Sequence, residues 1–153
     1  MSRRWRLSAF DQANLPYHWD SAKRRWIVDR DFTVTRIVDG KEQRLTIKAG
    51  FESDGYTGVY QCVDPLPAIV HDFIYEQCKV LDDGTPITFA DANNWLYYLM
   101  SISKDFVTRR LAWVYWAGVS IFGRQFWRTS VTFKAREIFR RKSRFSNFPP
   151  MVG

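Results

Sequence analysis

The feature that most constrains the fold is a β-hairpin signal in FTVTRIVDGKEQRLTIKAGF, residues 32–51. β-Branched residues alternate with polar residues on both sides of Asp39-Gly40, and this dipeptide favours the tight turn of a hairpin. The pattern predicts strands near 32–38 and 43–48. Because alternation places the apolar side chains on one face, that face must be covered by another part of the chain.

Helical segments follow the hairpin and supply that cover. Apolar residues recur at helical spacing in segments near 64–79 and 89–102, and a third helix is expected at roughly 105–122. Thr88 with Asp91 three residues later is a capping-box pattern, which marks the start of the second of these helices. We therefore expect consecutive helices joined by short turns.

The expected fold class is α+β: an N-terminal β-hairpin or small antiparallel sheet packed on about four helices, with extended terminal arms. Val34, Leu45 and Ile47 of the hairpin are expected to pack against the helices at 66–79 and 89–102. The expected organisation is an irregular N-terminal arm over 1–22, a single α+β domain over 23–128 that includes a short strand in 23–30, and a basic C-terminal helix and arm over 129–153, with the helix at 131–144.

Charge and aromatic content indicate the kind of partner. The formal net charge is +7, and basic residues cluster in SRRWR at the N-terminus and in KAREIFRRKSR near the C-terminus. Such a balance favours nucleic acid, phospholipid head groups or acidic protein surfaces. Aromatic residues make up 17% of the chain, which indicates a heavy core or a surface covered by a partner. Both arms are expected to make contacts beyond their own domain.

Several function classes find no support in the sequence. It contains no P-loop, no GxSxG motif and no Rossmann glycine pattern. Cys62 and Cys78 permit one disulfide, which is too few for a disulfide scaffold. The longest apolar run, 111–123, is shorter than the roughly 20 residues that a membrane-spanning helix needs. The N-terminus lacks the apolar core of a signal peptide, so the default expectation is a soluble protein of a reducing compartment.

The chemistry-bearing stretch is AIVHDFIYEQ, residues 68–77. His71 and Tyr75 are four residues apart and share a helix face, whereas Asp72 points about 100° away. If the next helix packs antiparallel, Asp91 faces His71, and we expect the two side chains within hydrogen-bond distance. A carboxylate on one ring nitrogen fixes the tautomer and raises the basicity of the other, as a water-activating histidine requires.

The same stretch permits a metal site. Asp72 and Asp54, with carbonyls from the glycine-bearing loop at 54–60, offer the oxygen ligands that Ca²⁺ prefers. The structural interpretation is a buried polar network that pins the loop 50–63 onto the helices, and spacing alone favours it. A phosphohydrolase site that includes His18 is a third, weaker interpretation, because His18 falls in the expected arm.

Four segments, AGFESDGYTG, PLPAIVHDFIYE, FADANNW and RRLAWVYWAGVSIFG, resemble in order the motifs of an uncharacterised family found in bacteriophages and prophages. The resemblance covers roughly residues 45–127. It implies a virion protein made in the cytoplasm of the bacterial host, such as a structural or accessory component of a tail, neck or baseplate. Its partners would be other virion proteins in a multi-subunit assembly, and no cofactor is expected.

A second resemblance is to the disulfide-free viral type of phospholipase A₂, which shows a calcium loop, an HD..Y helix and a later AD..F helix. It implies that His71 is the water-activating base, Asp72 a Ca²⁺ ligand, Asp91 the residue that orients His71, and Tyr75 a support of the network. The expected GxG core of the calcium loop is replaced by DGYTGVY, which departs from that pattern. The alternatives to a virion structural protein are therefore a calcium-dependent hydrolase and a nucleic-acid-contacting protein.

Overall fold

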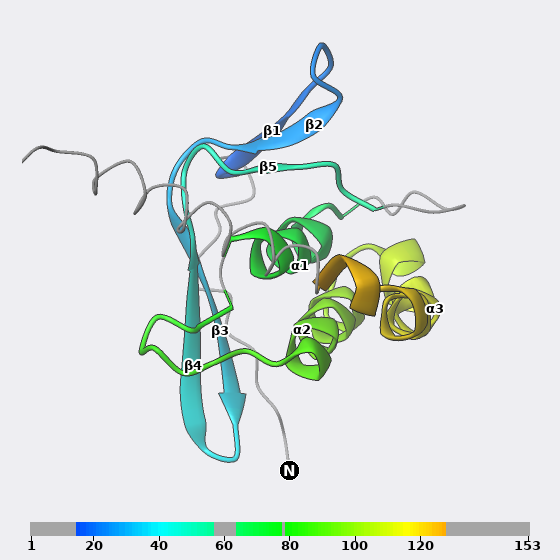
Figure 1. Ribbon diagram of the computed structural model, residues 1–153. Coiled ribbons are helices and arrows are strands. Elements are labelled where there is room, and N and C mark those ends of the chain that lie inside the picture. The colour runs from blue at the N-terminus through cyan, green and yellow to red at the C-terminus, as the bar shows by residue number, and fades with distance from the viewer. Residues whose placement is uncertain (1–14, 57–63, 78, 128–153) are drawn as a thin grey trace, which may run out of the picture.

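The computed structural model describes residues 15–56, 64–77 and 79–127. They form an α+β fold, as expected, with strands first and helices after them (Figure 1). The strands are β1 (Tyr17–Asp20), β2 (Arg25–Val28), β3 (Phe32–Val38), β4 (Lys41–Ile47) and β5 (Glu52–Ser53). The helices are α1 (Leu66–Glu76), α2 (Phe89–Ser101) and α3 (Phe106–Phe122). Both cysteines, the expected helix at 131–144 and most of both expected arms lie outside the described residues.

The β3–β4 hairpin forms where the sequence predicts it. Asp39 and Gly40 take φ values of 50° and 76°, the left-handed conformation that both central residues of a type I′ turn adopt. The resulting register pairs Val34 with Leu45, so both side chains lie on the same face of the hairpin and are fully buried. The turn and the alternating pattern thus select the same register.

The expectation of an irregular arm is wrong for residues 17–20, which form β1 and pair with β2. Trp19 lies opposite Trp26 with ring centroids 5.5 Å apart, an aromatic cross-strand contact that stabilises a short antiparallel pair. β2 also pairs with β5, in which Ser53 lies opposite Trp26. This three-stranded sheet brings the loop after the hairpin onto α1.

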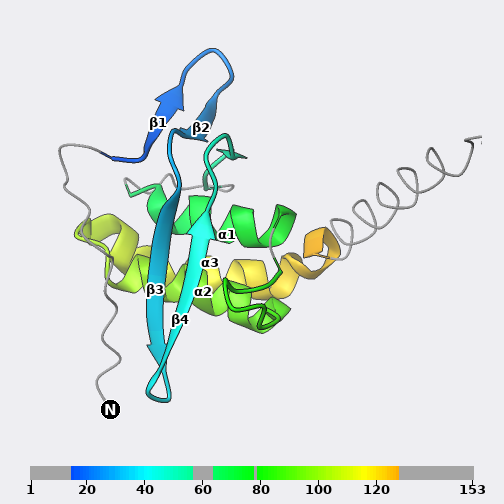
Figure 2. The same cartoon turned by 90° about the vertical axis from the view of Figure 1, so that its left-hand side faces the viewer.

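The core lies between the strands and the helices, and the predicted packing of the hairpin on both helices is confirmed. Figure 2 looks onto β3 and β4, with α1 and α2 behind them. The buried cluster between them includes Val34, Leu45, Ile47, Ile69, Val70, Phe73, Ile74, Ala92, Trp95 and Leu99. α3 packs on α2 and lies on the side of the helices away from the hairpin (Figure 1). No helix in the described part of the chain is long and apolar enough to cross a membrane.

Helix boundaries follow local signals. α1 begins after Pro65 and carries Pro67 in its first turn, where a backbone N–H has no partner within the helix. α2 begins at the predicted capping box: the Thr88 hydroxyl accepts from the Asp91 backbone N–H, and the Asp91 carboxylate accepts from the Thr88 backbone. The Asp105 carboxylate caps α3 by accepting from the backbone of its first turn.

Candidate functional site: a polar clasp on α1

His71 lies on α1 and points toward α2, where its partner is Asn93. The Asn93 amide oxygen accepts hydrogen bonds from His71 Nε2 at 3.2 Å and from the Tyr75 hydroxyl at 2.8 Å. The imidazole and phenol rings lie against each other with centroids 4.2 Å apart. All three side chains are buried, and burial raises the pKa of the Tyr75 hydroxyl above its usual value. We call these three residues the polar clasp.

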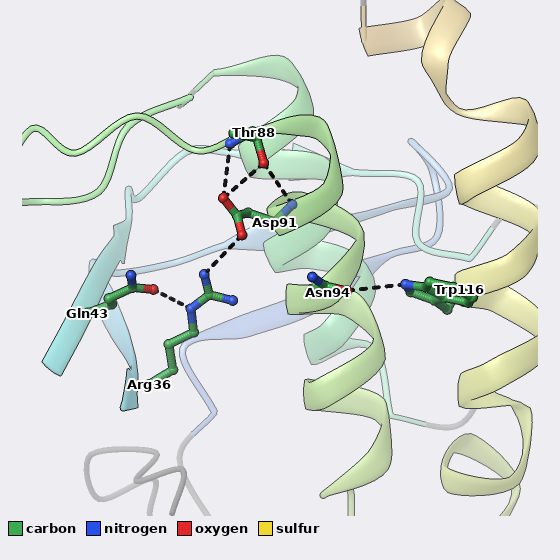
Figure 3. A network of polar contacts seen from close by, with 6 residues as sticks. All are labelled: Arg36, Gln43, Thr88, Asp91, Asn94 and Trp116. Atoms are coloured by element: carbon green, nitrogen blue, oxygen red, sulfur yellow. Dashed lines mark hydrogen bonds and ion pairs between the residues drawn. The ribbon is translucent and has the colours of Figure 1, made fainter. Parts of the chain in front are cut away.

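The predicted hydrogen bond between His71 and Asp91 is wrong. Asp91 accepts from the Thr88 hydroxyl at 2.9 Å and pairs with the Arg36 guanidinium at 3.7 Å (Figure 3). The reason is helical geometry: positions two apart on an α-helix point about 200° apart. When Asn93 faces α1, Asp91 therefore faces the β-hairpin.

Asp91 has a structural role on that side of α2. Arg36 is a buried residue of β3 whose Nε donates to the Gln43 side chain and whose guanidinium lies 4.6 Å from the centre of the Trp95 ring. A buried cation needs hydrogen bonds and a compensating charge, and the Asp91 carboxylate supplies the charge. Asp91 thus joins the cap of α2 to the hairpin (Figure 3).

The two residues predicted as metal ligands do come together, on the β5 side of α1. The Ser53 hydroxyl donates to Asp72 at 2.5 Å, and the Asp54 carboxyl lies close enough to Asp72 to feel its charge. Partial burial, and then the charge of Asp72, raise the pKa of Asp54. The pKa of Glu76, one turn further along α1, is raised by burial and by both aspartates.

This carboxylate group lies beside the clasp. Asp72 Oδ1 lies 3.9 Å from His71 Nδ1, too far for a hydrogen bond. Because Nε2 donates to Asn93, Nδ1 is the basic nitrogen of the neutral ring. Among the described residues, no group of three or more His, Cys, Asp or Glu side chains is arranged to hold a metal ion. Residues 57–60 of the loop expected to supply carbonyls are outside the described part.

His18 is not in an irregular arm but on β1, where it is exposed. Its Nδ1 contacts the carboxylate of Asp29, the residue that directly follows β2, at 2.8 Å. This contact ties the two strands together at the surface, and it gives His18 a partner of its own.

Two residues of the site were missed by sequence reasoning. Asn93 shares a helix face with Leu96 and Met100, three and seven residues later, and this spacing signals a buried polar side chain. Ser53 is fully buried, and its hydroxyl also accepts from the Gly55 backbone at 3.0 Å. Its signal is weaker, because two-residue strands such as β5 are too short to show a period.

The segments that carry the bacteriophage resemblance meet around α1. Ser53 holds Asp72 on one side of the helix, and Asn93 holds Tyr75 on the other. The last segment contributes Gly123, where an added Cβ would lie 2.7 Å from the Tyr75 hydroxyl. The four segments therefore share a packing role, whatever else they do.

Comparison of the chain with protein-family models, with curated proteins and with solved structures finds no match. The function is therefore argued from the geometry of α1 and its neighbours and from the resemblances in the sequence.

Proposed function

We propose that this chain is a structural or accessory protein of a bacteriophage particle, a tail, neck or baseplate component, in which α1 has a structural role. The observation that carries the proposal is the closed polar clasp of His71, Tyr75 and Asn93. The link to a bacteriophage comes from the four ordered segments in the sequence.

The polar clasp has the properties of a structural hydrogen-bond network. His71 is only 8% exposed, and its Nε2 is held by a neutral amide oxygen. A carboxylate in that place would stabilise an imidazolium and so favour proton transfer, whereas an amide oxygen gives orientation without charge. The predicted carboxylate, Asp91, is engaged in the cap of α2. Buried polar groups that satisfy one another are typical of networks that fix a single packing.

Contact with other particle components is assigned to the basic, aromatic ends of the chain. SRRWR and KAREIFRRKSR supply arginine and aromatic side chains, the residue types enriched in protein interfaces. A domain with a structural polar network inside it and contact residues at both ends suits a component that joins neighbouring particle proteins.

The proposal is tested in purified particles. Particles induced from a strain that carries the gene should contain the chain at a fixed ratio to the major capsid protein, as measured by quantitative mass spectrometry after a density gradient. A His71→Gln chain should enter particles equally, because glutamine can still donate to Asn93. Absence of the wild-type chain from the particles would refute the proposal, and host cytoplasmic proteins in the same fractions provide the background.

One observation favours a second candidate, a calcium-dependent phospholipase A₂-like hydrolase. Asn93 leaves Nδ1 of His71 as the basic nitrogen, and Asp72 and Asp54 lie together beside it, where they would hold Ca²⁺. The assay is release of fatty acid from phospholipid vesicles in the presence of calcium. Activity that His71→Gln abolishes in a folded chain would support this candidate, and no release by the wild type would eliminate it.

A further inference from the structure

α3 presents an apolar face to solvent. Phe106 and Trp113 are seven residues apart, as are Val107, Val114 and Ile121, so the five side chains form one stripe along the helix. They are well exposed: Phe106 is 59% accessible, Trp113 65% and Ile121 69%. A whole aromatic side chain has an area of about 150–250 Å², so the exposed parts of these two aromatic and three aliphatic side chains together amount to roughly 500 Å². That area is in the upper part of the range of roughly 300–600 Å² for the largest apolar patch on a typical monomer.

The stripe is not the face that holds α3 on the fold. Thr108 and Ala112 are buried on the opposite side of the helix, and Leu111, Tyr115 and Val119 pack there against the cluster that includes Leu96 and Met100. α3 is therefore apolar on two sides, which is typical of a helix covered on both. One side is covered by α2, and none of the described residues covers the stripe.

Basic residues lie on and beside α3, although the Arg109 guanidinium donates to the Ser103 carbonyl and the Arg124 guanidinium lies 5.6 Å from the centre of the Phe89 ring. Residues 104–127 contain four cations, Lys104, Arg109, Arg110 and Arg124, and one carboxylate, Asp105. That carboxylate is engaged as the N-cap: it accepts from the Thr108 hydroxyl and from the Thr108 backbone N–H, each at 2.6 Å, and these bonds lower its pKa. Arg110 lies within the stripe, with its guanidinium 5.1 Å from the centre of the Phe106 ring.

We propose that this face of α3 binds the surface of an anionic phospholipid bilayer, with the helix lying flat in the interface. Helices of this kind place aromatic and aliphatic side chains among the acyl chains and surround them with lysine and arginine. Arg110 can reach the phosphate groups while its aliphatic stem stays on the apolar side. Trp113, apolar in its ring and polar at its N–H, suits the interfacial depth.

Charge separates this partner from a second copy of the chain. A symmetric α3–α3 contact would bury both copies of Arg110 in one interface, and the nearby carboxylate of each copy is already engaged as a cap. Unpaired buried cations are strongly unfavourable, so such a dimer is disfavoured. A lipid phosphate pairs with each cation at the membrane surface, so no cation is buried without a partner. The proposed membrane contact depends on α3 alone and is independent of the proposed role in a particle.

The test uses the full chain and vesicles of phosphatidylglycerol and phosphatidylethanolamine, with phosphatidylcholine vesicles for comparison. Cosedimentation should show binding to the anionic vesicles, weakened by added salt because screening reduces attraction to the surface. Trp113→Ser and Ile121→Ser should each lower the partition coefficient about tenfold. Val80→Ser is the matched control, because Val80 is 44% exposed outside α3, and its binding should equal that of the wild type.

A charge pair completes the test. Arg110→Gln combined with Arg124→Gln should weaken binding about tenfold, whereas Lys41→Gln, on the exposed end of β4, should have little effect. The basic segment at 134–144 is kept in every variant, so that a loss reports on α3. Circular dichroism checks that each variant folds. If only one of the two serine variants folds, the vesicle binding of that variant decides the test.

Three results would overturn the inference. The first is no binding of the wild type to anionic vesicles. The second is equal binding by the wild type and a folded Trp113→Ser or Ile121→Ser chain. The third is a stable dimer in sedimentation equilibrium that either serine variant dissociates, since this would assign the stripe to a second copy.

Discussion

Replacing Asn93 with leucine removes the shared acceptor of the polar clasp and keeps the side chain close in size. Asn93 is 1% exposed, so solvent cannot take over its role. The change leaves His71 Nε2 and the Tyr75 hydroxyl buried without their acceptor. The clasp therefore predicts a large loss of stability from this single substitution.

The size of the loss follows from the two groups. Each buried donor without its acceptor costs about 1–3 kcal/mol. Burial of the leucine side chain returns about 1–2 kcal/mol, since an apolar group replaces a polar one. We therefore expect the free energy of unfolding to fall by about 3 kcal/mol, a large fraction of the 5–15 kcal/mol typical of a domain.

Asn94→Leu is the matched control, one residue further along α2. Asn94 is partly exposed and accepts from Trp116 Nε1 at 3.3 Å, a longer bond on the α3 side (Figure 3). Its replacement should cost less than about 1 kcal/mol. Urea denaturation followed by circular dichroism measures both, and Asn93→Leu should lower the midpoint by about 1.5 M with an unchanged slope.

A double-mutant cycle separates the clasp from general packing. In a Tyr75→Phe chain the phenol hydroxyl is absent, so Asn93→Leu then leaves only His71 without its acceptor. The cost of Asn93→Leu should be smaller in that background by about 1–2 kcal/mol. Equal costs in both backgrounds, or equal midpoints for the Asn93 and Asn94 variants, would refute the reasoning.

Two further predictions concern the neighbours of the clasp. Because the pKa of Asp54 is raised in the fold, its carboxyl favours the folded state at acidic pH and loses that contribution as pH rises through its folded pKa. Asp54→Asn should therefore stabilise the fold at neutral pH by less than about 1 kcal/mol, because it relieves the repulsion between position 54 and Asp72, and the melting temperature should rise. At mildly acidic pH the substitution should have little effect. A lower melting temperature at neutral pH would contradict this. Gly123→Ala should destabilise by about 1–3 kcal/mol in urea, because the added Cβ meets the Val119 backbone carbonyl oxygen and, at 2.7 Å, the Tyr75 hydroxyl. Gly118→Ala, with open space at its Cβ, should stabilise α3 by up to about 1 kcal/mol.

The strands and helices were predictable because their signals are local. The Asp39-Gly40 turn and the alternation around it fix the hairpin, and the Thr88 capping box fixes the start of α2. β1 and β5 escaped prediction for the opposite reason. Each is short, and each is stabilised by β2 across the sheet rather than by a pattern within itself.

The partner of His71 could not be predicted because the choice depends on a rotation of α2. Asp91 and Asn93 flank the apolar face of that helix on its two sides, and either one faces α1 for a different rotation about the axis. In the structure Asp91 faces the hairpin, where it pairs with Arg36, a buried cation on β3, and completes the capping box with Thr88. That cation lies some 55 positions before Asp91 in the chain, beyond the reach of a local pattern.

The amide at position 93 also fits the charge already present around α1. Asp54, Asp72 and Glu76 lie on the other side of the helix, and the pKa values of Asp54 and Glu76 are raised partly by this mutual repulsion. A further buried carboxylate at position 93 would add to that repulsion. An amide oxygen accepts from His71 and from Tyr75 without a charge, so it satisfies both buried donors at no electrostatic cost. The polar clasp thus orients the imidazole and the phenol without adding charge beside three carboxylates, and this supports the structural role proposed for α1.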